Sequence, residues 1–368
     1  MNGAQREVPV ERPEPKRLER LRRRLREEGY EALLVTNPYN RRYLTGFTGS
    51  FGYVLVTESR QILLSDFRYR TQAGFEAPDV EFVEHAARAE ETIGECLRSL
   101  GVTRLAIEAE SVTVADLRKY EAAWPGVQLE PVEGLVAALR AVKDDVELAV
   151  IREAARLADR TFDHLLGWIR PGLTEREVAI EIEMFLRRHG ASSSSFDTIV
   201  ASGERSALPH GVATDRRLGV GEFVKLDFGA YYRGYCSDLT RTIVLGKPTD
   251  RQRELYAVVL EAQETCLRGI RPGMTGREAD ALARDVIRRY GYEELFGHGT
   301  GHGIGLEIHE APRLSPTSES VLAAGMTVTV EPGIYVPGFG GVRIEDDVVL
   351  TAGGAETLTA APKQLISV

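Results

Sequence analysis

The sequence predicts an α/β protein of two domains, the second of which contains an internal duplication. A chain of 368 residues is long for one hydrophobic core, because domains usually hold about 100–200 residues. Short apolar segments alternate with helical segments up to about residue 140. Beyond that point the segment IRPGLTERE at 169–177 returns as IRPGMTGRE at 270–278. These observations together indicate two domains with different architectures.

The first domain, expected over residues 15–140, has the pattern of an α/β fold. A polar, proline-containing tail is expected before it, at 1–14. The first helix carries Leu18, Leu21 and Leu25 at helical spacing, and the arginines around them are interpreted as a solvated face. Further along, strands are expected at 31–37, 51–59, 61–67, 80–85, 104–110 and 127–132, and helices at 91–101 and 113–124.

The second domain, expected over residues 141–368, contains the duplication. A long helical pattern at 132–169 has no proline inside its helical part and no turn signal after Gly134, so one helix is expected to join the two domains. Each repeat has a Pro-Gly turn followed by a threonine suited to capping the next helix. A β-hairpin pattern follows each repeat, at 222–245 and 326–350. We therefore expect two helix-helix-hairpin units related by a pseudo-twofold axis, with the hairpins meeting near it.

Each predicted hairpin carries two acidic residues at corresponding places. These are Asp227 and Asp238 in the first hairpin and Glu331 and Glu345 in the second. If the hairpins face each other, four carboxylates converge, and such a group does not stay ionised without compensating charge. Two divalent cations would balance it. Oxygen ligands with one imidazole favour Mn²⁺, Co²⁺ or Fe²⁺ over the Cys/His sites typical of structural zinc.

The segment GHGTGHGIGLEIHE at 297–310 contains three histidines among several glycines. Glycine is costly inside regular structure and useful where the backbone bends sharply or passes close to other atoms. The segment is therefore expected to bring imidazoles to one place, whereas His85 and His164 are given no role in the site. HEAPR at 309–313 is not the HExxH motif of zincins, and no dinucleotide-binding GxGxxG, P-loop or GxSxG motif occurs.

Composition excludes several other classes of function. A formal net charge of -9 disfavours nucleic-acid binding. No apolar segment has the length of a membrane span, and the first residues lack the apolar region of a signal peptide. The three cysteines form no CxxC pair, which indicates a reducing compartment and predicts a cytoplasmic protein.

Five motifs in the second half resemble the metallopeptidase family of pita-bread fold that contains aminopeptidase P, prolidase and methionine aminopeptidase. They are SALPHG, KLDFGAYYRGYCSDLTRTI, GHGTGHGIGLEIHE, VTVEPGIY and GVRIEDDVVL, in the order in which the family has them. In the first half, NRRYLTGFTGS and LLSDFRYRTQA resemble the creatinase-type N-terminal domain of Xaa-Pro peptidases. Methionine aminopeptidases generally lack that domain, so the resemblance favours the Xaa-Pro peptidase branch.

The resemblance implies a role for each residue of the site. Its five metal ligands would be Asp227, Asp238, His302, Glu331 and Glu345, with Asp238 and Glu345 bridging two metal ions. His210 and His309 would contact the substrate and stabilise the tetrahedral intermediate, and Glu331 would also shuttle a proton. Two roles stay open for His298: support of the ligands around it, which is favoured, or a direct contact with the substrate.

The implied activity is hydrolysis of an Xaa-Pro bond by a hydroxide that two metal ions activate. Mn²⁺ or Co²⁺ is expected, with Zn²⁺ and Fe²⁺ as further candidates, and the family expectation is a homodimer. Arg313 or Arg343 would bind the carboxylate of a dipeptide, or Arg343 would orient an acid while Arg313 is part of the loop structure. The sequence leaves open whether the substrate is a dipeptide or a longer peptide. The alternative to an enzyme is a peptide- or protein-binding module on the same fold.

Overall fold

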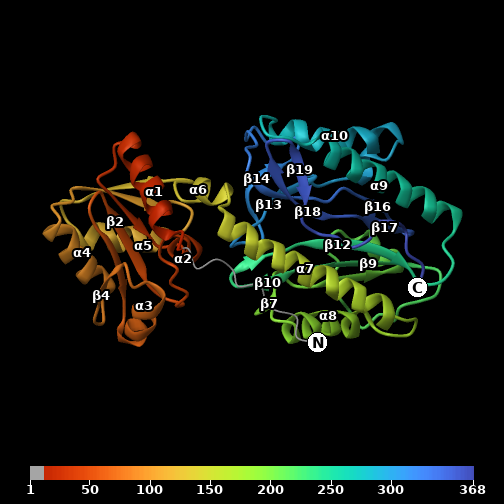
Figure 1. The fold of residues 1–368 in the computed structure, drawn as a ribbon, viewed down its shortest axis with the longest axis horizontal. Helices are drawn as coiled ribbons and strands as arrows, with labels where there is room; N and C mark the ends of the chain where they lie inside the picture. The colour runs from red at the N-terminus through yellow and green to blue at the C-terminus, as the bar shows by residue number, and fades with distance from the viewer. Residues whose placement is uncertain (1–11) are drawn as a thin grey trace. The chain divides into compact units, whose positions relative to one another are not determined.

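The computed structural model describes residues 12–368, which form two compact units (Figure 1). One unit ends at Arg140 and the other comprises Ala141–Val368. The expected tail at 1–14 lies outside the described residues, apart from its last residues, and the first helix, α1, already begins at Glu14. Within residues 12–368, no helix is both long enough and apolar enough to cross a lipid bilayer.

The first unit is built on a six-stranded mixed sheet in the order β4-β3-β2-β1-β5-β6. All six strands were predicted: β1 Ala32–Val35, β2 Tyr53–Thr57, β3 Gln61–Ser65, β4 Glu81–Glu84, β5 Arg104–Glu108 and β6 Gln128–Val132. The helices α1 Glu14–Glu28, α4 Ala89–Ser99 and α5 Val114–Ala123 were also predicted. Two short helices were not: α2 Pro38–Thr45 and α3 Arg70–Glu76. A third, α6 Ala137–Ala141, lies inside the predicted helical segment at 132–169.

Helix α2 escaped prediction because its buried face is partly polar. Arg41 is buried and donates hydrogen bonds to the carbonyls of Gly49 and Gly52 at 2.6 and 2.7 Å. A hydrophobic pattern therefore does not mark this helix. Its start does have a local signal, since the Asn37 side chain accepts hydrogen bonds from two main-chain amides and Pro38 occupies the first turn.

The expected continuous helix at 132–169 is wrong. Strand β6 ends at Val132, α6 covers Ala137–Ala141, and α7 begins only at Asp145 and runs to Trp168. Asp144 stops the helix from extending backwards, because its carboxylate accepts the amide of Glu147 at 2.9 Å while the Glu147 carboxylate accepts the amide of Asp144 at 3.0 Å. This capping box starts a new helix at the beginning of the second unit.

The second unit shows the predicted duplication. Helices α7 and α8 (Glu175–Arg188) belong to the first repeat, and α9 (Asp250–Gly269) and α10 (Gly276–Arg289) to the second. Thr174 and Thr275 cap the second helix of each repeat, and each forms a capping box with a glutamate three residues on. Gly172 and Gly273 both have positive φ, at 89° and 91°, which suits glycine in the preceding turn.

The predicted hairpins form the centre of this unit. Strand β9 (Phe223–Phe228) pairs antiparallel with β12 (Leu239–Val244), and β15 (Thr327–Val330) pairs with β18 (Asp346–Thr351). The two hairpins meet where the Glu345 amide donates to the Thr240 carbonyl at 3.1 Å. Short strands complete the sheets: β7 Ser193–Ser194, β8 Ile199–Ser202, β10 Ala230–Tyr232, β11 Tyr235–Cys236, β13 Gly301–Gly303, β14 Glu310–Leu314, β16 Gly333–Val336, β17 Gly340–Arg343 and β19 Gly354–Thr357.

The hairpins are less simple than the sequence predicted. Between β9 and β12 the chain forms β10 and β11, which pair with each other in a separate sheet. Gly229 makes this change of sheet possible, because a Cβ there would lie 1.7 Å from the Ser237 carbonyl oxygen. Strands β16 and β17 form the corresponding insertion in the second hairpin.

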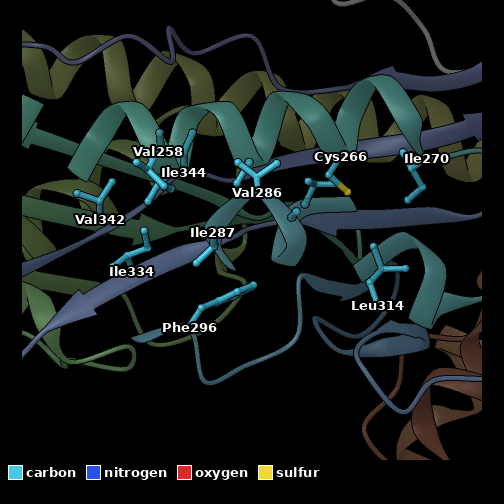
Figure 2. Packing of buried hydrophobic residues seen from close by; sticks show 14 of the residues in the cluster. Val258, Cys266, Ile270, Val286, Ile287, Phe296, Leu314, Ile334, Val342 and Ile344 are labelled. Atoms are coloured by element: carbon cyan, nitrogen blue, oxygen red, sulfur yellow. The ribbon is translucent and has the colours of Figure 1, made fainter. Parts of the chain in front are cut away.

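Each repeat packs its helices against its own strands. Figure 1 shows α7 and α8 beside the strands of the first half and α9 and α10 beside those of the second, as the contacts between these elements require. In the second half, Val258 and Cys266 of α9 and Val286 of α10 share a core with Ile334 and Ile344 (Figure 2). These helix faces brace the strands that carry the acidic residues.

We expect Thr174→Ala and Thr275→Ala to lower the free energy of unfolding of the second unit by similar amounts, about 1 kcal/mol each. The two threonines make equivalent capping boxes, so equal losses are the signature of the duplication. Denaturation of the metal-free protein measures the effect. Thr317→Ala, in an exposed loop, is the control and should leave the midpoint unchanged. Clearly unequal losses in the two variants would contradict the equivalence.

Candidate metal centre

The predicted site residues line one cavity in the second unit, which has a volume of about 540 Å³. Every candidate named from the sequence lines it: His210, Asp227, Asp238, His298, His302, His309, Arg313, Glu331, Arg343 and Glu345. These residues are spread over more than a hundred positions of the chain. The fold therefore brings together in one place the residues that the sequence analysis singled out.

The two hairpins place their acidic residues at strand ends in matching positions. Asp238 immediately precedes β12 and Glu345 immediately precedes β18. Asp227 lies near the end of β9, and Glu331 follows β15. Asp227 is paired with Thr240 in the β9–β12 ladder, and Thr240 is the residue at which the two hairpins meet. The carboxylates of both hairpins therefore lie near the junction between the hairpins.

Asp238, His302 and Glu345 form the tightest group. Each offers one ligand atom, and these atoms lie within 4.8 Å of one another. Strand β13 carries His302, whose Nε2 is 3.7 Å from Asp238 Oδ2 and 3.4 Å from Glu331 Oε1. Imidazole nitrogen and carboxylate oxygens at this separation can converge on one ion.

Burial and mutual repulsion shift the pKa values of this group away from their ordinary range. Burial, followed by repulsion from neighbouring carboxylates, holds the pKa of Asp238 and of Glu345 well above the ordinary range. Burial also raises the pKa of Glu331 to about 7 and lowers the pKa of His302 to about 3. Asp238 Oδ1 and Glu345 Oε1 are buried and have no hydrogen-bond donor anywhere in residues 12–368. Unpartnered oxygens beside a neutral imidazole fit a divalent cation.

Asp227 is engaged differently. Its Oδ2 forms an ion pair with Arg343 Nη2. The other nitrogens of Arg343 are also occupied, since Nε donates to Thr240 Oγ1 at 3.1 Å and Nη1 donates to the Pro209 carbonyl and the Tyr335 hydroxyl, each at 3.0 Å. Arg343 is 3% exposed. The structure thus places this arginine as an internal brace of the site.

Arg313 has the opposite environment. It lies on β14, lines the same cavity, and is exposed. Within the part of the chain that the structure describes, it makes no hydrogen bond or ion pair with another side chain. Its guanidinium is therefore free to bind a ligand that enters the cavity.

Three histidines besides His302 line the cavity: His309, His298 and His210. The ring of His309 meets that of His302 edge-on with 4.4 Å between centroids, and burial followed by the nearby Arg313 lowers the pKa of His309. His298 Nε2 lies 2.7 Å from the Tyr335 hydroxyl, so His298 contacts the partner of Arg343 and supports the site indirectly. His210 is exposed on the loop that precedes β9.

Other histidines lie outside the cavity. His164 and His189 both stack against Phe185, with ring centroids 4.4 and 3.9 Å apart. His85 lies in the first unit. His189 received no interpretation from the sequence, and its hydrogen bond to the Phe185 carbonyl places it at the end of α8.

Sequence reasoning missed part of the cavity lining. Phe196, Asp197, Ile199, Val212, Ile308 and Ser315 also contribute to it. Phe196, Ile199 and Val212 are ordinary apolar residues outside every motif, whereas Ile308 lies inside the segment 297–310 but carries no titratable group. Tyr335, which connects His298 to Arg343, was detectable in principle because it ends the VTVEPGIY motif.

The comparisons with known proteins agree with this geometry. Residues 149–352 match the model of metallopeptidase family M24, and residues 17–142 match the creatinase/prolidase N-terminal domain. The chain is 38% identical to the Xaa-Pro dipeptidase of Pyrococcus furiosus, with 95% of this chain and 99% of the relative covered.

Two solved structures are also similar. The structure of an Xaa-Pro dipeptidase from Bacillus anthracis is 50% identical, with a TM-score of 0.94 and coverage of 96% of this chain and 99% of that one. An X-Pro aminopeptidase from Thermotoga maritima is 40% identical, with a TM-score of 0.89 and coverage of 94% and 100%. The predicted fold class and the family resemblance are confirmed: the chain belongs to metallopeptidase family M24 and carries a creatinase/prolidase N-terminal domain.

Proposed function

We propose that the chain is a dinuclear-metal peptidase that hydrolyses Xaa-Pro bonds, with its catalytic domain over residues 141–368. The observation that carries the proposal is a cavity lined by the four predicted carboxylates, four histidines and two arginines. The similar Xaa-Pro dipeptidases and the X-Pro aminopeptidase support the choice of bond.

Five residues would hold the metal ions: Asp227, Asp238, His302, Glu331 and Glu345. The unpartnered oxygens of Asp238 and Glu345 support bridging positions for these two. When bound, divalent ions lower the pKa of a water molecule and polarise the scissile carbonyl. We propose Mn²⁺ or Co²⁺, because the donor set is mainly hard oxygen.

The protein's own groups would carry the protons and orient the substrate. The Glu331 carboxylate would take the proton of the attacking water and pass it to the leaving proline nitrogen. His309 and His210 line the cavity without belonging to the tight ligand group. Their imidazoles would contact the substrate carbonyl and stabilise the oxyanion, an effect worth about 2.7–4 kcal/mol for one donor.

The structure supports a choice between the two arginines. Each guanidinium nitrogen of Arg343 has a partner among the protein atoms, whereas Arg313 is exposed in the cavity. We propose that Arg313 binds the C-terminal carboxylate of a short substrate through its fork of donors. Arg343 would orient Asp227.

The alternative, a binding module without catalysis, is less well supported. Such a protein has no need for buried carboxylates that lack donors, and replacing them would relieve their repulsion. We further propose a homodimer, which is the family expectation. A cytoplasmic location is supported by three unpaired cysteines.

The first test uses metal-stripped protein reconstituted with Mn²⁺. Hydrolysis of an Xaa-Pro dipeptide and of an Xaa-Pro tripeptide is measured, with a proline-free dipeptide as the control. Because Arg313 is exposed beside the cavity, we expect the dipeptide to be preferred. Faster cleavage of the tripeptide would assign aminopeptidase activity instead. Absence of metal-dependent cleavage of all three peptides would refute the peptidase proposal in favour of the binding module.

The raised pKa of Glu331 predicts how pH affects the metal-free protein. Its pKa rises from an ordinary 4.5 to about 7 on folding, so between these values the unfolded chain has lost a proton that the folded chain keeps. Stability should therefore fall as pH rises from 4.5 to 7. Added Mn²⁺, which binds the ionised form, should reverse this trend. Thermal unfolding measures both effects.

The matched variant for this test is Glu331→Gln, which cannot ionise. We expect it to weaken the pH dependence of the metal-free protein, with the remainder due to Asp238 and Glu345, whose pKa values are also raised. It should also lower kcat/KM at least about a hundredfold, since even the replacement of residues that only support metal ligands costs about 10–100-fold. An unchanged pH dependence in the variant would show that Glu331 does not titrate as proposed.

Arg313→Met tests the carboxylate contact. Loss of a hydrogen-bonded charge costs about 1.5–3 kcal/mol, so we expect KM for the dipeptide to rise about ten- to a hundredfold. A dipeptide amide, which has no carboxylate, should be affected much less. Arg268→Met, on the exposed face of α9, is the control. Equal losses on the free and amidated dipeptides would contradict the assignment.

A further inference from the structure

Lys225 is a buried lysine at the centre of β9 whose place in the site is not explained by metal binding. It is two residues before Asp227, so both side chains point to the same face of the strand. Lys225 is 0% exposed, and it makes no ion pair with any carboxylate of residues 12–368. Burying an ammonium group without a counter-ion is costly, and an apolar residue would stabilise a strand centre better. The burial of Lys225 therefore indicates a role other than stabilising the fold.

The contacts of Lys225 point to one segment. Its Nζ donates hydrogen bonds to the main-chain carbonyls of Leu208 at 2.5 Å and Pro209 at 3.1 Å. These are the two residues that immediately precede His210. Lys225 Nζ also lies 5.0 Å from the centre of the Tyr335 ring.

The segment that carries His210 is held mainly through main-chain groups: the Val212 amide donates to the His210 carbonyl at 2.9 Å, and the Val212 carbonyl accepts Arg205 Nη2 at 2.8 Å. The side chains that flank the histidine are exposed, with Leu208 at 49% and Val212 at 59%, so apolar burial does not fix the loop. Apart from Lys225, the Pro209 carbonyl accepts a hydrogen bond from Arg343, and the Leu208 carbonyl accepts the amide of Gly211 at 3.2 Å.

We propose that Lys225 is a positioning residue that sets the direction of the His210 imidazole into the cavity. Lys225 acts by donating hydrogen bonds to the carbonyls of Leu208 and Pro209, and Arg343 also donates to the Pro209 carbonyl. The proposal rests on the proposed function, in which His210 contacts the substrate. It assigns Lys225 neither a metal-binding nor a covalent role.

The contacts of Lys225 also predict that replacing this residue changes the structure only locally. Both carbonyls keep one other donor, so removing the ammonium leaves neither without a hydrogen bond. The loop should shift or become mobile while the strand stays intact. Because a displacement of about 1 Å can cost up to about a hundredfold in rate, a local shift of His210 is sufficient to be measured.

The first experiment is a double-mutant cycle with the Mn²⁺-loaded protein and an Xaa-Pro dipeptide. We expect Lys225→Met to lower kcat/KM about ten- to a hundredfold, and Lys225→Arg, which retains donors, to recover most of the loss. Lys247→Met, an exposed lysine after β12, is the matched control. In a His210→Ala background, Lys225→Met should have an effect below about twofold, because the residue it acts through is gone. Losses that multiply in the double variant would overturn the proposal.

The second experiment does not depend on activity. Histidine ring signals are recorded by NMR from metal-free protein with labelled histidine, and the signal lost in His210→Ala is assigned to His210. We expect Lys225→Met to move or broaden this signal and to leave those of His164 and His189 unchanged. An unaffected His210 signal would refute the positioning role. If Lys225→Met does not fold, Lys225→Gln, whose amide is one bond shorter, takes its place.

The two experiments separate the two proposals. If the unmodified protein cleaves no Xaa-Pro peptide, the proposed function fails, while the NMR comparison still decides whether Lys225 orients His210. If the protein is active but its His210 signal is insensitive to Lys225, the peptidase proposal stands and the positioning role is wrong.

Discussion

Repulsion among buried carboxylates is the constraint on which the second unit depends. Asp238 and Glu345 are both almost fully buried, at 5% and 1% exposure, and each keeps an oxygen without a donor. Without a cation, such groups take up protons instead of remaining charged. The surrounding cations reduce the repulsion only in part, since Arg343 pairs with Asp227 and Arg241 pairs with Asp346 at 2.8 Å. The centre is therefore built for ions that supply the remaining positive charge.

Duplication explains how a fold can hold so unfavourable a group. Each repeat contributes one hairpin braced by its own helix pair, and the hairpins join through the hydrogen bond from Glu345 to Thr240. Thr240 is also the donor to Glu345 Oε2 at 2.6 Å. A residue of one hairpin thus orients a carboxylate of the other. Because neither hairpin contains a complete site, the ligands can assemble only when both repeats are folded.

Many of the correct predictions came from segments that repeat and from charged residues that interrupt an apolar strand pattern. Both capping threonines and the titratable cavity residues that lie in the quoted motifs were predictable for that reason. Asp197, which lies outside those motifs, was missed. The six strands of the first unit were predicted from a different signal, their short apolar segments separated by turn residues. Helix α2 was not predicted, because it depends on buried polar contacts such as those of Arg41. The break before α7 was also missed, because it depends on the part-buried capping box of Asp144 and not on an apolar pattern. Likewise, Phe196 carries no chemical signal, and only the fold reveals that it lines the cavity.

The two arginines show what a structure adds to a motif. Both lie close to motif histidines and acids in the sequence, and both line the cavity, yet one has its donors directed at protein atoms and the other is exposed. Selection for peptide length would then depend on Arg313, a residue outside the ligand group. Arg343 touches Asp227, the loop before His210 and Tyr335 at once. If Arg313 binds the substrate as proposed, substitutions at exposed positions of the cavity could change substrate preference without altering Arg343 and its contacts.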